Sequence, residues 1–186
     1  MKRLQLCATA LAGVHVVQRQ HLGDERGFLA RLFCRDELQA AGWDGPIAQI
    51  NHTATRQRGT VRGLHFQHPP HAEMKLVSCL RGEVWDVAVD LRAGSPTFLH
   101  WHAEVLSAQN GRALLIPPGC AHGFQTLCDD VEMLYCHSQA HAPAAEDGLA
   151  AREPRLALPW PLPVAQLSAR DQAWPPLPAN YGGIHL

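Results

Sequence analysis

The sequence lacks an excess of charge of either sign. Its 186 residues contain 16 Lys and Arg against 17 Asp and Glu, which gives a formal net charge of −1 and an isoelectric point of about 6.9. A chain without a basic field does not attract nucleic acid or an anionic membrane surface. Long hydrophobic runs are also missing, and none approaches the roughly 20 residues of a membrane-spanning helix. We therefore expect no nucleic-acid partner and no membrane partner.

Paired cysteine motifs are absent too. The six cysteines include no Cys-x-x-Cys pair, and several lie within apolar stretches. Scattered thiols of this kind predict reduced cysteines and a cytoplasmic location rather than disulfides or a zinc site. The first residues imitate a signal peptide only weakly, because Gln5 and Thr9 interrupt a short apolar stretch. Cys120 precedes His122 by two residues, but no carboxylate that could orient the histidine is evident nearby, which disfavours a cysteine nucleophile.

Glycine-rich phosphate loops are missing as well. The chain has neither a P-loop nor a Gly-x-Gly-x-x-Gly turn. Bound ATP or NAD is therefore not expected, and no cofactor is predicted.

What the sequence does contain is a series of short apolar stretches between turn residues. They predict strands at residues 14–18, 28–33, 48–52, 62–67, 75–80, 84–90, 98–106, 113–116, 123–126 and 131–137. Glycine and proline pairs predict the turns between them, beginning with Gly23-Asp24. Residues 35–41 predict one short helix. Many short strands at even spacing favour an all-β fold, a barrel of the jelly-roll type.

The chain is expected to form one domain over residues 1–186, since it shows no internal repeat and no low-complexity linker. We place its core at about residues 24–171. Seven of the fourteen prolines fall in residues 154–186. This proline-rich end predicts an irregular tail on the surface, with a short helix near Ser168 and no regular structure over 172–186.

Two segments fit the pattern of a cupin, a small jelly-roll barrel that commonly binds a metal. Residues 111–122 read Gly, five residues, Pro-x-Gly, two residues, His, and end at His122. His65-Phe-Gln67 stands where a metal-binding cupin would place a His-x-His pair. An amide is a poor ligand for a transition metal. The sequence therefore predicts a barrel without a metal, in which His65 is free to transfer protons.

A series of motifs then resembles one enzyme family, the dTDP-4-dehydrorhamnose 3,5-epimerases and related nucleotide-sugar epimerases. The motifs keep the family's order from Asp24 to Asp171, and they are residues 24–28, 49–51, 59–67, 73–77, 86–92, 95–98, 116–124 and 167–171. The resemblance implies inversion of the carbons beside the C4 ketone of a 4-keto-6-deoxy sugar attached to a nucleoside diphosphate. A base would remove the α-proton, an enolate would form, and an acid would return a proton from the opposite face.

The resemblance also implies a role for five side chains. His65 matches the base, and Asp171 matches the carboxylate that pairs with it, as in other His–Asp dyads. Lys75 matches the cation beside the enolate oxygen, where a positioned donor contributes roughly 3 kcal/mol to catalysis. Tyr135 matches the general acid, and His122 is a further polar group of the pocket. Asp86 is expected to support these residues from behind.

Substrate-binding positions follow from the same resemblance. Arginines suit diphosphate oxygens, and those at family positions are Arg26, Arg62 and Arg170. Residues matched to the nucleotide or the pocket are Phe28, Gln49, Asn51 and Gln67. A homodimer is expected, since an N-terminal strand crosses between subunits in the family.

The sequence departs from the family mainly where the nucleotide is bound. His141 stands where the family usually has a Tyr against the nucleobase, and Arg31 replaces a Glu that contacts the nucleoside. Glu73 replaces a common Gln two residues before Lys75. These changes leave open another nucleotide, another sugar, and inversion of only C3 or only C5.

Two other classes of protein remain open from the residues alone. One is a metal-dependent cupin enzyme with ligands His65, Glu73 and His122, supplemented by His68 and His71. The other is a non-catalytic sugar-binding cupin. The first predicts activity that depends on a metal, and the second predicts binding without exchange of any sugar C–H proton.

Overall fold

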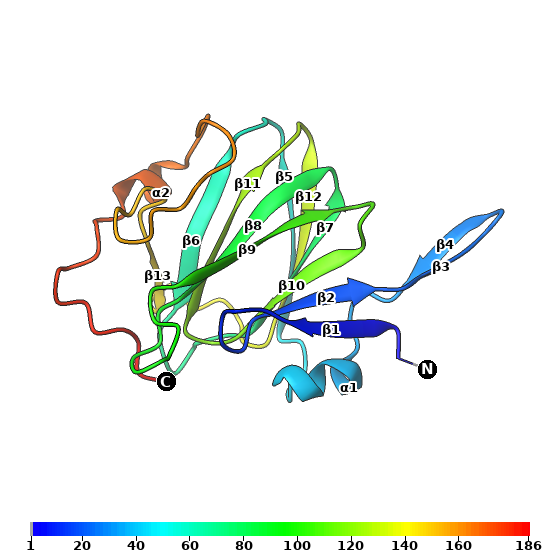
Figure 1. Ribbon diagram of the computed structural model, residues 1–186, viewed down its shortest axis with the longest axis horizontal. Coiled ribbons are helices and arrows are strands. Elements are labelled where there is room, and N and C mark those ends of the chain that lie inside the picture. The colour runs from blue at the N-terminus through cyan, green and yellow to red at the C-terminus, as the bar shows by residue number, and fades with distance from the viewer. Residues whose placement is uncertain (1) are drawn as a thin grey trace.

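A computed structural model describes residues 2–186 and consists mainly of antiparallel strands. One sheet has six strands in the order β1 (Leu4–Ala8), β2 (His15–Arg19), β10 (Arg112–Ile116), β7 (Lys75–Arg81), β12 (Val131–His137) and β5 (Gln49–Thr55). The other has five, in the order β13 (Glu146–Gly148), β6 (Val61–Gln67), β11 (Cys120–Thr126), β8 (Glu83–Asp90) and β9 (Trp101–Ser107). Figure 1 shows the two sheets facing each other. The predicted all-β jelly-roll fold is confirmed.

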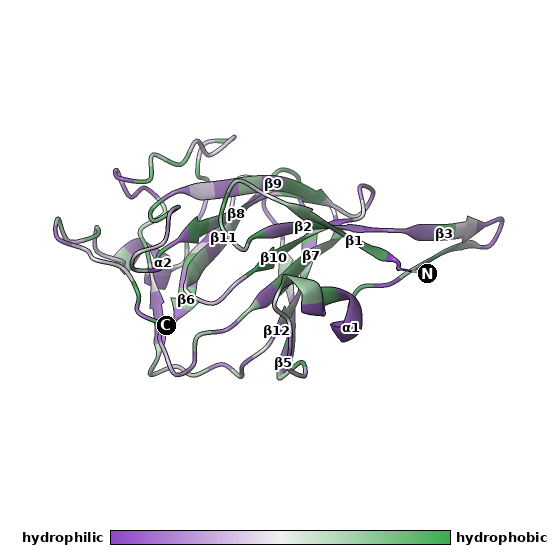
Figure 2. Cartoon of the chain, turned by 60° about the horizontal axis from the view of Figure 1, so that its bottom comes forward, coloured by the Kyte–Doolittle hydropathy of each residue, from purple (hydrophilic) through white to green (hydrophobic). Residues whose placement is uncertain are grey.

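Hydrophobic side chains lie between the sheets and also on both outer faces. Between them pack residues of both sheets, including Val77, Ala88, Leu114 and Phe124. Outside the six-stranded sheet a second cluster surrounds Trp43. A third covers the five-stranded sheet with residues that follow the strands, among them Leu149, Leu156 and Ile184. Successive side chains of a strand point to opposite faces, so strands covered on both faces have hydrophobic residues at successive positions, as the green stretches along β7, β8 and β10 show (Figure 2).

The core extends beyond residues 24–171 on both sides. Leu4, Leu11 and Val17 are at most 2% exposed and belong to the clusters on and beneath the six-stranded sheet. Ile184 is buried near the other end of the chain. The first two strands and the end of the tail are therefore part of the packed body.

A two-stranded hairpin of β3 (His21–Asp24) and β4 (Gly27–Ala30) projects away from this body (Figure 1). The sequence predicted one strand over residues 28–33 with a turn at Gly23-Asp24. That boundary is wrong: Asp24 pairs with Gly27, and the turn is formed by Glu25 and Arg26. Every β3 side chain is exposed, so the sequence of this strand shows no alternation of hydrophobic and polar residues that would predict it.

Most other predicted strands are present within a few residues of their expected bounds, but β1, β3 and β13 were not predicted. β9 begins at Trp101 instead of Phe98, since residues 96–99 form turns and Leu99 adopts a positive φ of 59°. The helix expected at 35–41 divides into α1 (Arg35–Leu38) and the 3-10 turn η1 (Gln39–Ala41). No helix within residues 2–186 is long and apolar enough to cross a membrane.

The proline-rich tail is largely irregular and lies against the five-stranded sheet. It contains α2 (Ala169–Ala173), whose N-cap Ser168 accepts a hydrogen bond from the backbone N–H of Asp171 at 3.0 Å. Ser at an N-cap satisfies one of the free N–H groups of the first turn. This short helix brings Asp171, only 4% exposed, next to β6.

Candidate active site

A cavity of about 850 Å³ is lined by residues of both sheets and of the tail. All five side chains matched to catalytic roles line it: His65, Lys75, His122, Tyr135 and Asp171. Six of the nine expected binding residues line it as well: Gln49, Asn51, Arg62, Gln67, His141 and Arg170. The topology thus brings together residues more than a hundred positions apart in the sequence.

A bulge in β6 orients two of these side chains. Against β11, the register runs from His65 opposite His122 to Arg62 opposite Phe124, so three residues of β6 span two of β11. A bulge of this kind re-aims a side chain. It allows Arg62 and His65 to face the same cavity although they are three residues apart. At this point Gly63 has a φ of 121°, and an added Cβ would lie 2.6 Å from the Cα of Gly123.

His65 forms a dyad with Asp171. The imidazole Nε2 lies 2.6 Å from Asp171 Oδ1, and the Gly63 N–H donates to Oδ2 at 3.4 Å. Burial opposes ionisation of Asp171, but the hydrogen bond and charge of His65 outweigh it and lower the pKa of this carboxyl. An ionised Asp171 accepts the Nε2–H, which leaves Nδ1 of His65 as the free basic nitrogen.

His122 is held by a second carboxylate. Its Nε2 lies 3.1 and 2.9 Å from the two oxygens of Asp86, whose side chain is completely buried. Burial raises the pKa of Asp86, against the opposing influence of His122. The contact is the supporting one expected for Asp86, and it fixes the orientation of the His122 ring at the cavity wall.

Tyr135 remains a phenol throughout the neutral range. Burial raises its pKa well above the usual value, and the hydroxyl contacts Thr53 Oγ1 at 3.5 Å. Its ring lies edge-on to His122, with 6.0 Å between centroids, and stacks on His137 at 6.2 Å. A buried phenol of this kind keeps its proton available for donation.

Lys75 lies in an ion pair. Its Nζ is 2.9 Å from Glu73 Oε1 and donates to the His65 carbonyl at 3.1 Å. Both charged side chains are less than 10% exposed. Glu73, which stands where the family commonly has Gln, therefore places its negative charge next to Lys75, the cation expected to bind the enolate oxygen.

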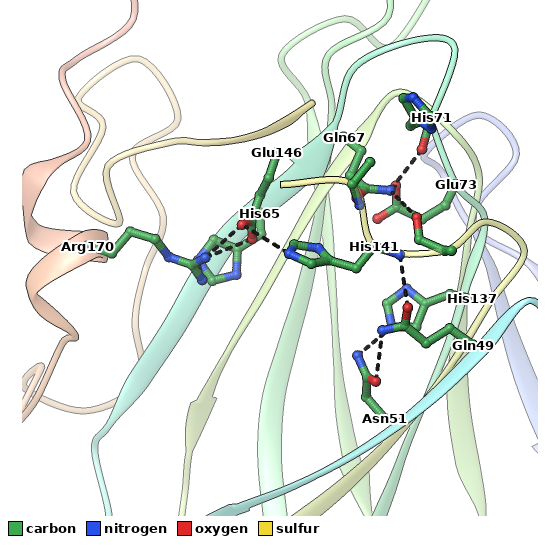
Figure 3. A network of polar contacts seen from close by, with 12 residues as sticks. Gln49, Asn51, His65, Gln67, His71, Glu73, His137, His141, Glu146 and Arg170 are labelled. Atoms are coloured by element: carbon green, nitrogen blue, oxygen red, sulfur yellow. Dashed lines mark hydrogen bonds and ion pairs between the residues drawn. The ribbon is translucent and has the colours of Figure 1, made fainter. Parts of the chain in front are cut away.

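Gln67 lines the cavity, and both ends of its amide also bind other residues of the protein. Its Nε2 donates to the carbonyl of His71 and to Glu73, both at 2.9 Å, while its Oε1 accepts from the Ala142 N–H at 2.6 Å. The amide is thus used within the protein (Figure 3). These hydrogen bonds of Gln67 hold together the segments that form this wall of the cavity.

A polar group at one end of the cavity involves the residues matched to the nucleotide. Gln49 Nε2 donates to Asn51 Oδ1 at 3.0 Å, and Gln49 Oε1 accepts from the His141 N–H at 2.9 Å. Asn51 Nδ2 lies 3.5 Å from His137 Nε2. Figure 3 shows this group beside His141, which lies 3.8 Å from Glu146.

Three arginines line the cavity, Arg56, Arg62 and Arg170, and the last two have different surroundings. Arg62 donates to Thr55 Oγ1 at 2.9 Å and to the Ala54 carbonyl at 3.3 Å. Arg170 pairs with both oxygens of Glu146 at 2.9 and 2.8 Å, and its Nη2 lies 3.2 Å from Nε2 of His65. Arg170 therefore places a positive charge beside the candidate base.

The remaining three predicted binding residues lie outside the cavity, on or just after the projecting hairpin. Arg26 pairs with Asp24 and is 84% exposed, while Phe28 is 64% exposed and stacks on His21. Arg31 pairs with Glu37, which also accepts the N–H groups of Arg3 and Leu4. Within one chain, Arg31 thus ties β1 to α1 and does not contact the substrate cavity.

Sequence reasoning missed several cavity residues. His137 lies two positions after Tyr135 on β12, so the alternation of the strand could have identified it. Burial, followed by the charge of Lys75, lowers the pKa of His137 to about 4. Glu146 and Thr53 also line the cavity. Glu146 is placed there by β13, a strand of only three residues without a readable pattern.

The alternative chemistries meet specific obstacles in this geometry. His65, His122 and Glu73 are bound to Asp171, Asp86 and Lys75 respectively. No three His, Cys, Asp or Glu side chains converge as a metal site in the part of the chain that the structure describes. Burial raises the pKa of Cys120 to about 12, so its thiol is unsuited to nucleophilic attack.

Known proteins of one family resemble this chain over most of its length. Residues 8–179 match the family model described as dTDP-4-dehydrorhamnose 3,5-epimerase. An enzyme of that description from Salmonella typhimurium is 39% identical over 169 residues, covering 90% of this chain and 92% of its own. The crystal structure of a Bacillus anthracis dTDP-4-dehydrorhamnose 3,5-epimerase with TDP and pyrophosphate bound superimposes with a TM-score of 0.90 at 35% identity, covering 94% of this chain and 99% of that one.

A structural relative with a narrower activity is also similar. A 3'-monoepimerase from Streptomyces bikiniensis, in complex with dTDP-quinovose, superimposes with a TM-score of 0.84 at 33% identity, covering 91% of this chain and 86% of that one. With the family model matching nearly the whole chain, the protein belongs to the dTDP-4-dehydrorhamnose 3,5-epimerase family.

Proposed function

We propose that this protein is a cofactor-independent epimerase that inverts C3, C5 or both in a nucleoside-diphosphate 4-keto-6-deoxy sugar, a step of deoxysugar biosynthesis. One observation carries the proposal. His65 comes from β6 of the five-stranded sheet and Tyr135 from β12 of the six-stranded sheet, yet both line one cavity. Inversion requires a base on one face of a carbon and an acid on the other.

The proposed reaction begins at His65. Its Nδ1 takes the proton from the carbon next to the C4 ketone, and the C–H electron pair moves into an enolate. Asp171 stabilises the imidazolium that forms. Lys75 donates a hydrogen bond to the enolate oxygen as negative charge develops there. Tyr135 then protonates the same carbon from the opposite side, which leaves the configuration inverted.

The diphosphate is assigned to arginines. Arg62 lines the cavity, and Arg170 has its guanidinium at the cavity edge. We further propose a homodimer in which the β3–β4 hairpin reaches a second copy and brings Arg26 and Phe28 to its site. The exposed apolar side chains Phe28 and Leu29 on this hairpin support that arrangement. We expect the protein in the cytoplasm, consistent with its six free cysteines.

The identity of the nucleotide is tested first with dTDP, because the structural relatives are described with TDP or a dTDP sugar bound. His141, which differs from the family pattern and lines the cavity, is the position at which another nucleotide would be selected. The number of carbons inverted is tested next, because both a 3,5-epimerase and a 3'-monoepimerase resemble this chain.

Incubation with dTDP-4-keto-6-deoxyglucose in heavy water tests the function. Deuterium at C3 and C5, lost in His65→Ala, supports a 3,5-epimerase, and deuterium at one carbon supports a mono-epimerase. His68→Ala is the matched control, since His68 pairs with Asp147 on the surface and is absent from the cavity lining. Tight binding without any deuterium entry would contradict the proposal and favour a sugar-binding protein, and activity lost on metal chelation would favour a metal enzyme.

A further inference from the structure

Glu73 forms a buried contact that limits how Lys75 can act. The ammonium has three N–H donors. One is directed to Glu73 at 2.9 Å and one to the carbonyl of His65 at 3.1 Å. With the Lys75 side chain only 9% exposed, the remaining donor is the one available to the cavity. Glu73 therefore sets both the position and the direction of the cation.

The second carboxylate oxygen of Glu73 also accepts a hydrogen bond from within the protein. The Ala142 N–H donates to Gln67 Oε1 at 2.6 Å, and this contact fixes which end of the Gln67 amide is the donor. Gln67 Nε2 consequently donates to Glu73 Oε2 at 2.9 Å. In this structure Glu73 accepts hydrogen bonds from Lys75 and Gln67 at the same time. A carboxylate has two acceptor oxygens, whereas an amide has one acceptor and one donor.

Gln67 connects Glu73 to the segment that carries His141. Ala142 follows His141, whose own N–H donates to Gln49 at 2.9 Å. A continuous chain of hydrogen bonds thus runs from Lys75 through Glu73 and Gln67 to residues 141–142. Figure 3 shows Gln67 between Glu73 and this segment.

We propose that Glu73 is a positioning residue that holds Lys75 at the enolate oxygen and, through Gln67, holds the 141–142 segment at the other end of the cavity. Its effect on the reaction rests on the proposed function, in which Lys75 contacts that oxygen. Its effect on the 141–142 segment does not depend on any substrate. The pair also makes the Lys75 site neutral before the enolate forms, so the cation acts by one directed hydrogen bond.

Three variants separate the effect of the charge at position 73 from the effect of the side-chain length there. Glu73→Gln removes the charge and one acceptor, and Glu73→Asp keeps the charge and both acceptors on a shorter side chain. Glu104→Gln is the matched control, because Glu104 of β9 is a partly buried carboxylate paired with Arg112 of β10. The other titratable groups around Lys75 in the pocket and beneath it are His65, His122, His137 and Cys120.

The assay is the initial rate of deuterium entry against pH, normalised to the folded fraction, together with the Ala142 amide resonance in a ¹H–¹⁵N spectrum. In Glu73→Gln we expect kcat to fall roughly 10- to 100-fold, as for a catalytic group displaced by about 1 Å. The pH profile of the rate should also change, because the variant removes the carboxylate that is paired with the Lys75 ammonium. The Ala142 amide should move upfield as its bond to Gln67 lengthens.

Glu73→Asp should keep the wild-type pH profile but show reduced kcat, and Glu104→Gln should match the wild type in all three measurements. Wild-type kcat, pH profile and Ala142 resonance in folded Glu73→Gln would overturn the proposal. If the wild-type protein exchanges no sugar proton at all, the proposed function fails, while the Ala142 resonance still tests the positioning role of Glu73.

Discussion

Asp171→Asn tests the His65 dyad with almost no change in shape. The carboxylate lies 2.6 Å from His65 Nε2, with side-chain exposures of 3% for Asp171 and 24% for His65. When His65 accepts a proton, the new imidazolium lies about 4 Å from the carboxylate charge centre. At an effective dielectric of about 20 this attraction is about 4 kcal/mol.

The partial exposure of His65 weakens this attraction, so we expect a loss of roughly 3 to 4 kcal/mol, which corresponds to a fall in kcat of roughly 100- to 1000-fold. An asparagine can also donate to Nε2 and place the imidazole proton on Nδ1, where it blocks the base. The assay is the initial rate of deuterium entry from heavy water followed by NMR.

Asp147→Asn is the control for this variant, because Asp147 forms a similar pair with His68 at 2.9 Å on the surface. The pH profile of the rate should also change in Asp171→Asn, because the carboxylate paired with His65 is removed. A kcat within threefold of wild type would refute the assignment of Asp171 as the partner of the base.

Three further predictions follow from buried groups. Burial opposes ionisation of Asp90, but hydrogen bonds from Arg92, Ser95 and Thr97 lower its pKa to about 2. The ionised Asp90 therefore stabilises the folded state fully above about pH 4, and this stabilisation is lost as pH falls toward 2. Asp90→Asn should lose about 2 kcal/mol of unfolding free energy at pH 7 and show a flatter decline below pH 4, and an unchanged urea midpoint would contradict this. The C2–H resonance of His137 should titrate near pH 4. A midpoint above about pH 6 would show that the ring is accessible to solvent and would contradict this prediction. Gly63→Ala should destabilise the fold by about 3 kcal/mol or more, because its Cβ would meet Gly123 and the His122 carbonyl at a φ of 121°; an unchanged thermal midpoint would argue against this close approach.

The strands that carry the proton-transfer residues were readable from the sequence because each is a hydrophobic stretch with turn residues at its ends. The residues on β6, β7, β11 and β12 fall in strands predicted within three residues of their observed bounds. The hairpin was misplaced because all of β3 is exposed and gives no alternation. β13 is too short to show a pattern, so Glu146 could not be recognised as a cavity residue.

Contacts between side chains were much less predictable than the strands. Position alone suggested a substrate contact for Gln67, and it gave no sign that the amide also binds His71, Glu73 and Ala142. Arg31 was matched to a nucleoside contact, yet its partner is Glu37 of α1. Competing partners of this kind depend on which loops approach a strand, and a linear pattern contains no information on that.

The most direct test of opposite-face proton transfer is the Tyr135→Phe variant in heavy water. Without the phenol, His65 can still form the enolate and return a deuteron to the same face. We predict that deuterium enters the sugar with retained configuration, and that the ratio of exchange to inversion rises at least tenfold over wild type. Inversion at the wild-type rate in Tyr135→Phe would contradict the account.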